Sequence, residues 1–362
     1  APPLVQTLEE TLGVPFPCQA IERKIVGYYL HSGDAKIRLH MGGNLSYVTH
    51  NIAIDTYLLE KAREMGVTVL PGRVEAIDFY SNKVVVKSDA GGTEVDVLVG
   101  AFGLDATTSA SLEKVTPYRR PKPLYSILTK IPASKDYLQG CEDYVHVFLP
   151  SMEDIEFGVV TPKLTNFVVN IAGPEVNKGS LKRFLSLPEI RELVHSRDPG
   201  LVSQPVAFPL EPARNCFGDR WVAIGDTAGL VRAYKGNGIN AACTTGAKAA
   251  EVMLKVGISK EAFKSYHGAF SDIVNDLHYG RVLRKIILYG ERTHLMPEIL
   301  RVASRDRKMV NVLIDFLSGN KTYRRILKES GAVNLLIRFL KGLTPSLLQN
   351  TRLARKATKG LP

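Results

Sequence analysis

The stretch from residue 220 to residue 256 constrains the fold of this chain more than any other part of the sequence. A short apolar run, 221–224, leads into Gly225-Asp226, a glycine-rich loop follows, and residues 239–256 show helical spacing. Turn residues bound the apolar run on both sides, as is typical of a buried strand. The sequence therefore predicts a strand, a tight loop and a helix, in that order.

The loop after this strand has the composition of a ligand-binding turn. Glycines let the backbone approach a ligand closely, and the first residues of a helix present unpaired N–H groups and the positive end of the helix dipole. Asp226 stands at the carboxyl end of the strand, where open α/β sheets place ligand contacts. An ordinary strand–turn–helix unit has the same spacing, so spacing alone leaves both interpretations open.

Composition places the chain among globular proteins with substantial cores. The 362 residues are 45% apolar and 23% charged, and the mean hydropathy is −0.02. Such a chain has room for one large or two ordinary domains. The cysteines, Cys18, Cys141, Cys216 and Cys243, form no CxxC pair and no cluster with histidines. This spacing argues against disulfides or a zinc site and predicts buried thiols in a reducing, cytoplasmic compartment.

The positive charge of the chain lies at its C-terminal end. Residues 301–362 contain 14 Lys/Arg and 3 Asp/Glu, which accounts for the whole formal net charge of +11. Residues 333–341 are apolar with basic punctuation, which fits both an amphipathic segment at an anionic membrane surface and a solvated helical cap. No apolar run reaches the ~20 residues of a membrane span. The basic residues lack interleaved aromatics, so we expect no nucleic-acid partner.

Apolar periodicity and turn residues predict the remaining elements. Helices are expected at 4–12, 51–66, 181–186, 189–196 and throughout 260–350. Strands are expected at 25–30 and 35–39 as a hairpin, at 45–49 and 67–70, at 73–79, 83–88 and 93–100 as a meander, and at 124–130, 144–149, 155–161, 166–172 and 204–210. The Pro-rich, charged stretch 116–123 predicts a boundary, and the strands after it predict an antiparallel sheet.

Three motifs resemble sequences of one flavoprotein family. Residues 220–240 resemble its second flavin motif. Residues 51–58 resemble its Arg-x-x-x-Asp-x-x-Leu helix, with Asn51 in place of the arginine, and residues 100–103 resemble its Gly-Ala-Asp-Gly turn, with Phe102 in place of the aspartate. The family is that of the FAD-dependent reductases and monooxygenases with the para-hydroxybenzoate hydroxylase type of fold. The basic helical end is similar to that of its geranylgeranyl reductase-like branch.

The resemblance implies an α/β (α+β) fold with an FAD/NAD(P)-binding Rossmann-like domain, an antiparallel-sheet substrate domain and a helical C-terminal region. The expected domains are 1–116 with 211–258 for FAD, 117–210 for substrate, and 259–362 for the basic helical region. The family's GxGxxG unit, which wraps the ADP half of FAD, does not occur in this sequence. Because the chain also starts at Ala1 without a methionine, we expect an N-terminally incomplete domain that holds FAD weakly.

The resemblance implies FAD as cofactor and assigns residues to it. In the family the aspartate hydrogen-bonds a ribityl hydroxyl, a role that falls on Asp226, and the helix start faces the pyrimidine end of the flavin ring. The expected cofactor-binding residues are Gly225, Asp226, Gly236, Asn237, Gly238, Ile239, Asn51 and Gly103, with Asp55 close to them. No catalytic acid is identified; His50, His146 and Tyr144 are candidates by residue type only.

The implied activity is reduction of carbon–carbon double bonds in a prenyl or isoprenoid lipid by reduced FAD. The expected partners are a hydrophobic isoprenoid or other small-molecule substrate and an electron donor, NAD(P)H or ferredoxin. An FAD-dependent monooxygenase or halogenase of the same fold is an alternative. A catalytically idle relative acting at a membrane surface is another, motivated by Asn51 and Phe102. The basic C-terminal helices are expected to make a peripheral membrane contact, which gives a cytoplasmic protein that is peripheral at the membrane.

Overall fold

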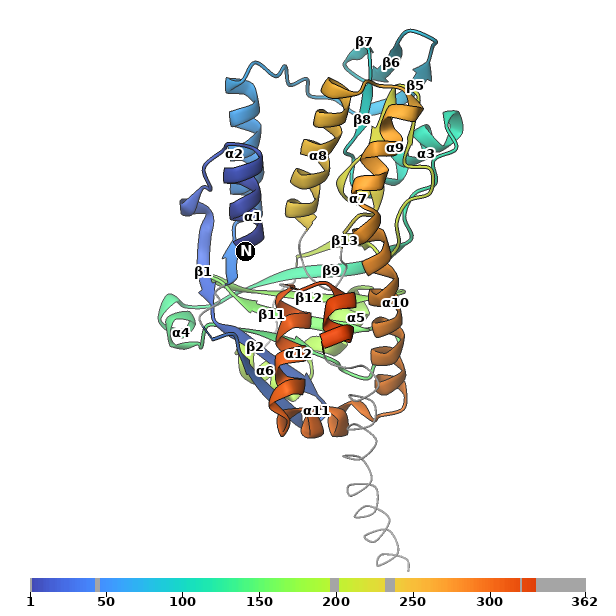
Figure 1. The fold of residues 1–362 in the computed structure, drawn as a ribbon. Helices are drawn as coiled ribbons and strands as arrows, with labels where there is room; N and C mark the ends of the chain where they lie inside the picture. Colours follow the sequence, from blue (N-terminus) through green and yellow to red (C-terminus); the bar gives the residue numbers. More distant parts are fainter. Residues whose placement is uncertain (1, 43–45, 196–201, 232–237, 320, 330–362) are drawn as a thin grey trace, which may run out of the picture. The chain divides into compact units, whose positions relative to one another are not determined.

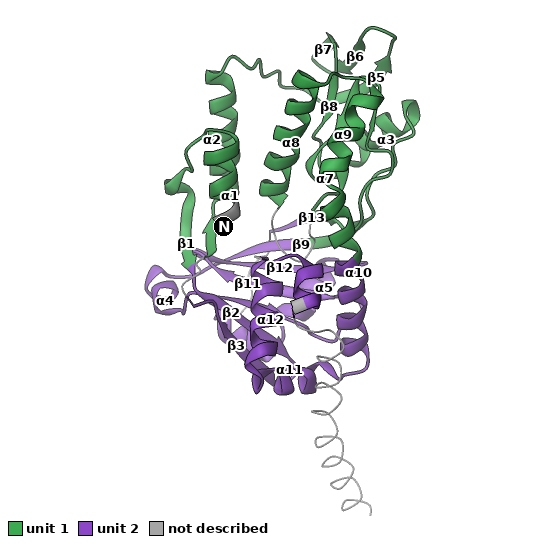
Figure 2. Cartoon of the chain, viewed as in Figure 1, with its two compact units in different colours: residues 1–24, 45–126, 205–278 green, residues 25–44, 127–204, 279–362 purple. Residues whose placement is uncertain are grey.

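The chain forms two units, each built from three separate stretches of sequence (Figure 2). The fold is known from a computed structural model, which describes residues 2–42, 46–195, 202–231, 238–319 and 321–329. Unit 1 comprises Ala1–Lys24, Leu45–Ser126 and Pro205–His278. Unit 2 comprises Ile25–Asn44, Ile127–Gln204 and Tyr279–Pro362.

The predicted helices and strands are largely present (Figure 1). Unit 1 contains α1 (Pro2–Gln6), the π-helical turn η1 (Thr7–Thr11), the 3-10 turn η2 (Cys18–Ala20), β1 (Ile21–Ile25, ending at the boundary), β4 (Ser46–Thr49), α2 (Asn51–Glu64), β5 (Val74–Phe79), β6 (Val84–Ser88), β7 (Gly91–Val95), β8 (Leu98–Gly100), α3 (Ala106–Val115), β14 (Phe217–Gly218), β15 (Trp221–Ala223), α7 (Gly225–Ala228), α8 (Gly238–Lys255) and α9 (Lys260–Ala269).

Unit 2 contains β2 (Gly27–Ser32), β3 (Ala35–His40), α4 (Lys135–Gly140), β10 (Tyr144–Phe148), β11 (Phe157–Pro162), β12 (Asn166–Gly173), α5 (Lys178–Leu185), α6 (Pro188–Val194), α11 (Met296–Ser304), α12 (Arg307–Ser318) and α13 (Tyr323–Glu329). Strands β9 (Pro123–Pro132) and β13 (Ser203–Pro209) and helix α10 (Ser271–Arg292) cross from one unit to the other.

The centre of unit 1 is a short parallel pair. Strand β15 lies parallel to β8, with Trp221 opposite Leu98 and Ala223 opposite Gly100, and β14 adds to it in the antiparallel sense. Every residue of β15 is buried, which confirms the buried strand predicted from the apolar run. Helices α8 and α9 contribute to the same core, since Ala249, Phe263 and Tyr266 are among its buried side chains. The two strands that carry the predicted flavin motifs are therefore direct neighbours.

The meander prediction is correct except at its last strand. Strands β5, β6 and β7 pair antiparallel in sequence order. The expected strand 93–100 is divided: its first part lies in β7, while β8 leaves the meander to pair with β15. The predicted strand 67–70 is absent from the structure, since these residues have no strand conformation. Val67 and Leu70 are 55% and 67% exposed, so this β-branched run finds no sheet to join.

A second core in unit 1 joins the N-terminal helices to α8. Buried Leu8 and Ile54 pack with the partly buried side chains of Ile239 and Cys243. This core brings the first turns of α2 and α8 against the same apolar side chains. Both helices were predicted from periodicity, whereas their association depends on contacts about 190 residues apart in sequence.

The large sheet runs in the order β13-β9-β12-β11-β10-β2-β3 and belongs mostly to unit 2. It was predicted to be antiparallel and to consist of strands from 117–210, and the structure corrects both points. Strand β10 pairs in parallel with β2, with Tyr144 opposite Gly27 and Phe148 opposite His31. The hairpin β2–β3, expected in the flavin domain, therefore completes the sheet of the other unit, and the compact units divide the chain differently from the expected domains.

Helices of unit 2 contribute to two separate cores that include the sheet strands. One contains Phe167 and Ile171 of β12 with Leu181 and Phe184 of α5. A Cβ atom at Gly158 of β11 would lie 2.1 Å from the Phe184 ring, so this close approach requires a glycine. The other core combines side chains of β2 and β3 with α11 and α12. The sheet is thus stabilised by α5 and by the C-terminal helices α11 and α12, as well as by its own hairpins.

The remaining expectations divide between described and undescribed residues. Helices α9 to α13 confirm the helical character of residues 260–329, while 333–341 lie outside the described residues. All four cysteines lie within the described chain and none forms a disulfide; Cys216 is buried as expected, whereas Cys141 and Cys243 are partly buried and Cys18 is exposed. Among the described helices, none combines the length and the apolarity needed to cross a bilayer.

Candidate flavin site

Strand β15 ends in a turn whose backbone is held on several sides. The Ile224 amide donates to the Gly100 carbonyl at 3.0 Å, and the Tyr266 hydroxyl donates to the Ala223 carbonyl at 2.9 Å. The Gly225 amide donates to Thr245 Oγ1 of α8 at 2.9 Å. Because buried backbone groups need such partners, strand, turn and helix form one connected structure.

Gly225 is required at this turn for two reasons. Its φ of +55° lies in the left-handed region, which favours glycine. A Cβ atom there would also lie 3.2 Å from the Ala242 Cβ of α8, a tighter contact than side chains usually make. The glycine predicted to bind cofactor thus has a structural role in letting α8 pack beside the strand end.

The turn after β8 is hydrogen-bonded to the loop after β15. Thr227 Oγ1 donates to the Gly103 carbonyl at 3.1 Å, and the Tyr118 hydroxyl donates to the Thr227 carbonyl at 2.8 Å. Gly103 has a φ of +61°, so the chain reverses there in a backbone conformation that favours glycine. Two predicted site motifs, separated by more than 120 residues, are therefore neighbours.

Asp226 is placed with its carboxylate toward the start of α8. A Cβ atom built on Gly238 would lie 3.8 Å from Asp226 Oδ1. The side chain is half-buried, and burial raises the pKa of its carboxyl above the ordinary value of 3.8. Over the described part of the chain, this carboxylate has no hydrogen-bond or ion-pair partner. Within the described residues, its acceptor oxygens therefore have no donor.

A second acceptor without a partner lies in the first turn of the same helix, α8. Asn240 Oδ1 is buried and lacks a partner among the described residues. Buried acceptors without donors are costly and uncommon. A ligand with hydroxyl and N–H donors, such as the ribityl chain and ring N–H of a flavin, has the hydrogen-bonding groups that these two residues lack. The residues present therefore fit the cofactor implied by the sequence.

The other predicted cofactor residues divide into three groups. The side chain of Ile239 packs into the apolar core with Leu8, so it has a structural contact. Gly236 and Asn237 lie outside the described residues. Asn51 is exposed at the first position of α2. Other side chains of α2 pack in one apolar core with side chains of α8. The structure thus gathers Gly103, Gly225, Asp226 and Gly238, and places Asn51 on an adjoining helix.

Phe102, which replaces the usual aspartate, belongs to the core. Its ring meets Tyr118 edge-on, with centroids 6.3 Å apart at 89°, and Tyr118 meets Trp221 in the same way. The substitution is therefore accommodated by aromatic packing beneath the two turns. Sequence inspection missed Tyr118 and Thr245, which hold the turns, because neither belongs to a local motif.

The three acid candidates chosen by residue type have other contacts. His50 caps α2, since its Nδ1 accepts from the Ala53 amide at 3.2 Å. In unit 2, His146 Nδ1 lies 3.1 Å from His31 Nε2, and burial lowers the pKa of His146 to about 4, so it is neutral at pH 7. The Tyr144 hydroxyl lies 2.8 Å from His40 Nδ1. Each of the three has a local structural partner.

Comparison with known proteins identifies sequence relatives and structural neighbours of the chain. No family model matches the sequence. The chain is 24% identical over 264 residues to a chloroplastic geranylgeranyl diphosphate reductase of Nicotiana tabacum, covering 66% of this chain and 55% of that protein. Its fold matches a geranylgeranyl bacteriochlorophyll reductase-like protein from Thermoplasma acidophilum with a TM-score of 0.68, at 17% identity over 89% of this chain and 86% of the other.

The fold also matches a flavin-dependent brominase, Bmp2, with a TM-score of 0.63, at 15% identity over 90% of this chain and 85% of the other. The chain is thus similar in sequence and in fold to the superfamily of FAD-dependent oxidoreductases of geranylgeranyl reductase and para-hydroxybenzoate hydroxylase type. The fold expected for this superfamily, an α/β flavoprotein fold with a second, sheet-containing part, is confirmed. The chain spans about half the length of the curated relatives that it matches.

Proposed function

We propose that this chain binds FAD and that reduced FAD serves to saturate carbon–carbon double bonds of a prenyl or isoprenoid lipid. The supporting observation is the carboxylate of Asp226 beside the start of α8, which has no partner among the described residues and follows the strand where the two flavin-motif turns meet. The similarity to a geranylgeranyl diphosphate reductase favours a prenyl substrate.

In this proposal each residue acts on the cofactor through its own chemistry. Asp226 accepts hydrogen bonds from the ribityl hydroxyls, and Asn240 accepts from a further donor. The first turn of α8, which begins at Gly238, offers backbone N–H groups and the positive end of its dipole to the flavin ring. When bound, FAD supplies the hydride. The alkene gains one hydride and one proton, so two electrons come from NAD(P)H or ferredoxin, and water or a nearby donor provides the proton.

An anaerobic turnover assay tests the proposal. The full chain is supplied with FAD, dithionite and geranylgeranyl diphosphate, and the products are analysed by mass spectrometry. We expect products heavier by two hydrogens per saturated bond, and far less product with Asp226→Ala. Absence of saturated product, under conditions in which the chain binds and reduces flavin, would contradict the reductase assignment.

A monooxygenase or halogenase is the second candidate, and the similarity to the brominase fold supports it. In that case molecular oxygen is the oxidant and is consumed as substrate is oxidised. Measurement of oxygen uptake in the presence of NADPH, FAD and an aromatic substrate, with and without added halide, distinguishes the two. Uptake matched one-to-one by hydroxylated or halogenated product would replace the reductase assignment.

A catalytically idle relative is the third candidate. It is supported by Asn51, which lacks the charge and fork of an arginine, and by Phe102, whose partly buried ring packs against the core of unit 1. Failure of dithionite to reduce flavin bound by the full chain would favour it. The peripheral membrane contact proposed for the basic C-terminal end is tested by sedimentation with anionic vesicles.

A further inference from the structure

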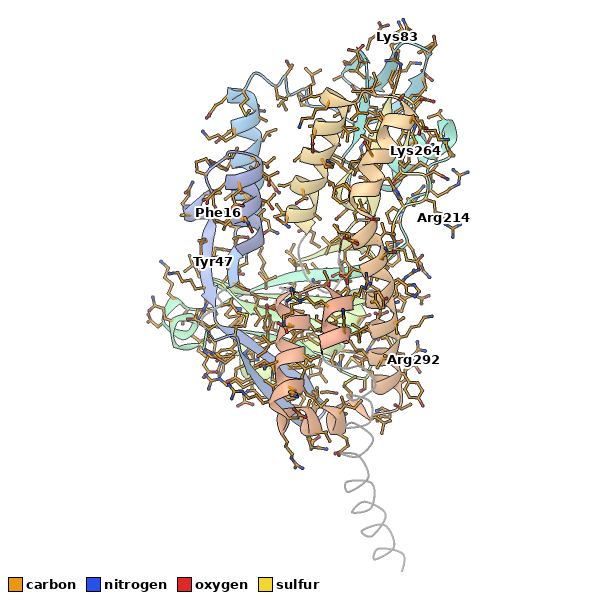
Figure 3. All side chains as sticks on the ribbon, viewed as in Figure 1. Phe16, Tyr47, Lys83, Arg214, Lys264 and Arg292 are labelled. Atoms are coloured by element: carbon orange, nitrogen blue, oxygen red, sulfur yellow. The ribbon has the colours of Figure 1, made fainter. Side chains whose placement is uncertain are left out.

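A cavity of about 510 Å³ lies within unit 2, and none of the residues that line it belongs to the candidate flavin site. It is enclosed by the loop after β10, residues 151–156, by Pro174 and by the C-terminal end of α10. Arg292, the last residue of α10 and one of the residues that line the cavity, is labelled in Figure 3. Two of the residues that line the cavity, Glu156 and Glu291, carry buried carboxyl groups.

Glu291 is the most unusual of these groups. It is only 4% exposed, it lines the cavity, and its Oε1 atom has no hydrogen-bond partner in the part of the chain that the structure describes. Burial first, and then the nearby carboxylate of Glu156, raise the pKa of Glu291 to about 8, while Arg292 opposes this effect. A buried carboxyl oxygen without a donor is costly for the fold. It is also a ready acceptor for a bound group.

Glu156, the neighbouring buried acid, does have partners for its carboxylate oxygens. Glu156 is 6% exposed and forms a two-point ion pair with Arg284, whose Nε donates to Oε2 at 2.8 Å while a second guanidinium nitrogen reaches Oε1. The charge of Arg284 is thus matched by Glu156. Among the described residues no cation forms an ion pair with Glu291, and the cavity lining also contains Glu156 and the exposed Glu153.

Several other residues that line the cavity are apolar. Met152, Ile155 and Leu288 line the cavity, so an aliphatic group of a few carbons would be removed from water there. Leu288 and Glu291 lie three residues apart on α10 and therefore share one face of the helix. The exposed His294 and Arg292 stand at the rim. The lining of the cavity thus combines carboxyl groups with apolar side chains.

These features select among ligand classes. Once Glu291 is ionised, an anion in the cavity would be repelled by its carboxylate. A metal ion needs several ligands, and no group of three His, Cys, Asp or Glu residues able to hold one is found among the described residues. We propose that the cavity binds a small organic cation, a primary alkylammonium whose N–H groups donate to Glu291 and whose alkyl part lies against Met152, Ile155 and Leu288. Such a ligand supplies the donor that Glu291 lacks.

Calorimetric titration of the full chain with n-butylammonium tests this proposal, with 1-butanol and butyrate as neutral and anionic probes of the same size. At pH 8.5 we expect saturable binding of the cation, at least about tenfold tighter than that of either other probe. Glu291→Gln should weaken it by a similar factor, while Glu192→Gln, an exposed position of α6, should leave it unchanged.

The wild-type chain provides a further measurement that needs no variant. Because Glu291 must be ionised to pair with an ammonium group, affinity for n-butylammonium should rise as the pH increases from 6 to 9. Absence of saturable binding, equal affinity for 1-butanol, full affinity in Glu291→Gln or affinity that is flat over this pH range would overturn the proposal. So would Glu291-dependent binding of Mg²⁺ without binding of the amine.

Discussion

The carboxylate of Asp226 is half-buried beside the first turn of α8, without a partner among the described residues. A residue kept for stability would have a hydrogen bond or an ion pair there, because an ionised carboxylate loses solvation on burial. The cost of this carboxylate in the unliganded chain is explained if a ligand supplies the missing donors. The site therefore predicts opposite effects of one substitution on stability and on binding.

The stability effect of Asp226→Ala is expected to be neutral or favourable at pH 7. The pKa of Asp226 is raised in the fold, so the folded state binds its proton more tightly and stability falls as pH rises above 3.8. The alanine variant removes that loss. Urea unfolding at pH 7 without flavin measures it.

Asp105→Ala provides a control with the opposite sign. Asp105 caps α3 by accepting from the Thr108 amide at 2.7 Å, and that bond lowers the pKa of its carboxyl. Its loss should reduce the free energy of unfolding by about 1 kcal/mol. If Asp226→Ala destabilised the chain as much as Asp105→Ala, Asp226 would be a structural residue.

Glu291 predicts a pH dependence. With a pKa of about 8 in the fold and 4.5 unfolded, it keeps its proton longer in the folded state, so the free energy of unfolding declines between these values. The groups facing it are Glu156 and Arg292, with Glu153 and His294 at the rim. Glu291→Gln should match wild type at pH 4.5 and be more stable at pH 9 by at least about 1 kcal/mol. A constant difference from wild type at both pH values would refute this account of Glu291.

At the scale of elements, the strand–turn–helix unit depends on Gly225. Gly225→Ala introduces both an unfavourable φ and a contact at 3.2 Å with Ala242, whereas Gly103→Ala introduces the unfavourable φ alone. We expect Gly103→Ala to cost about 1 kcal/mol and Gly225→Ala to cost more, as measured by chemical unfolding. Equal costs would mean that α8 can move away from the turn without penalty.

The packing of α5 on the large sheet depends on Gly158. An added Cβ would overlap the Phe184 ring, so Gly158→Ala should destabilise unit 2 by about 1–3 kcal/mol. Gly140→Ala is the matched control, because nothing lies within 4 Å of its Cβ position. Thermal unfolding followed by circular dichroism compares them. A Gly158→Ala midpoint as high as that of Gly140→Ala would show that α5 does not pack as described.

Elements held by local contacts were predictable from sequence, and elements defined by distant partners were not. The hairpin β2–β3 and the meander follow from alternation and turn residues within about 25 residues. The parallel pair β2–β10 joins residues more than 110 apart and leaves no local pattern. The same distinction applies to the site: Gly225 and Asp226 stand in one motif, whereas Tyr118 and Thr245 reach it only through folding.

At the scale of the whole molecule, the flavoprotein fold explains why distant motifs converge. The turn at Gly103 and the loop at Asp226 follow adjacent parallel strands, so the fold brings both to one sheet edge. Charge was less informative, because the excess of basic residues lies mostly in a tail whose final 33 residues are outside the described range. The division into two units also differs from the expected domains, because β2 and β3 join the later sheet.

Equilibrium titration of FAD into the full chain, followed by flavin fluorescence, tests the central claim most directly. We predict saturable binding to wild type, the same affinity in Asp96→Ala, which changes an exposed carboxylate, and an affinity at least about tenfold weaker in Asp226→Ala. Failure of the wild-type chain to bind FAD, or equal affinity of wild type and Asp226→Ala, would contradict the assignment of this site to the flavin.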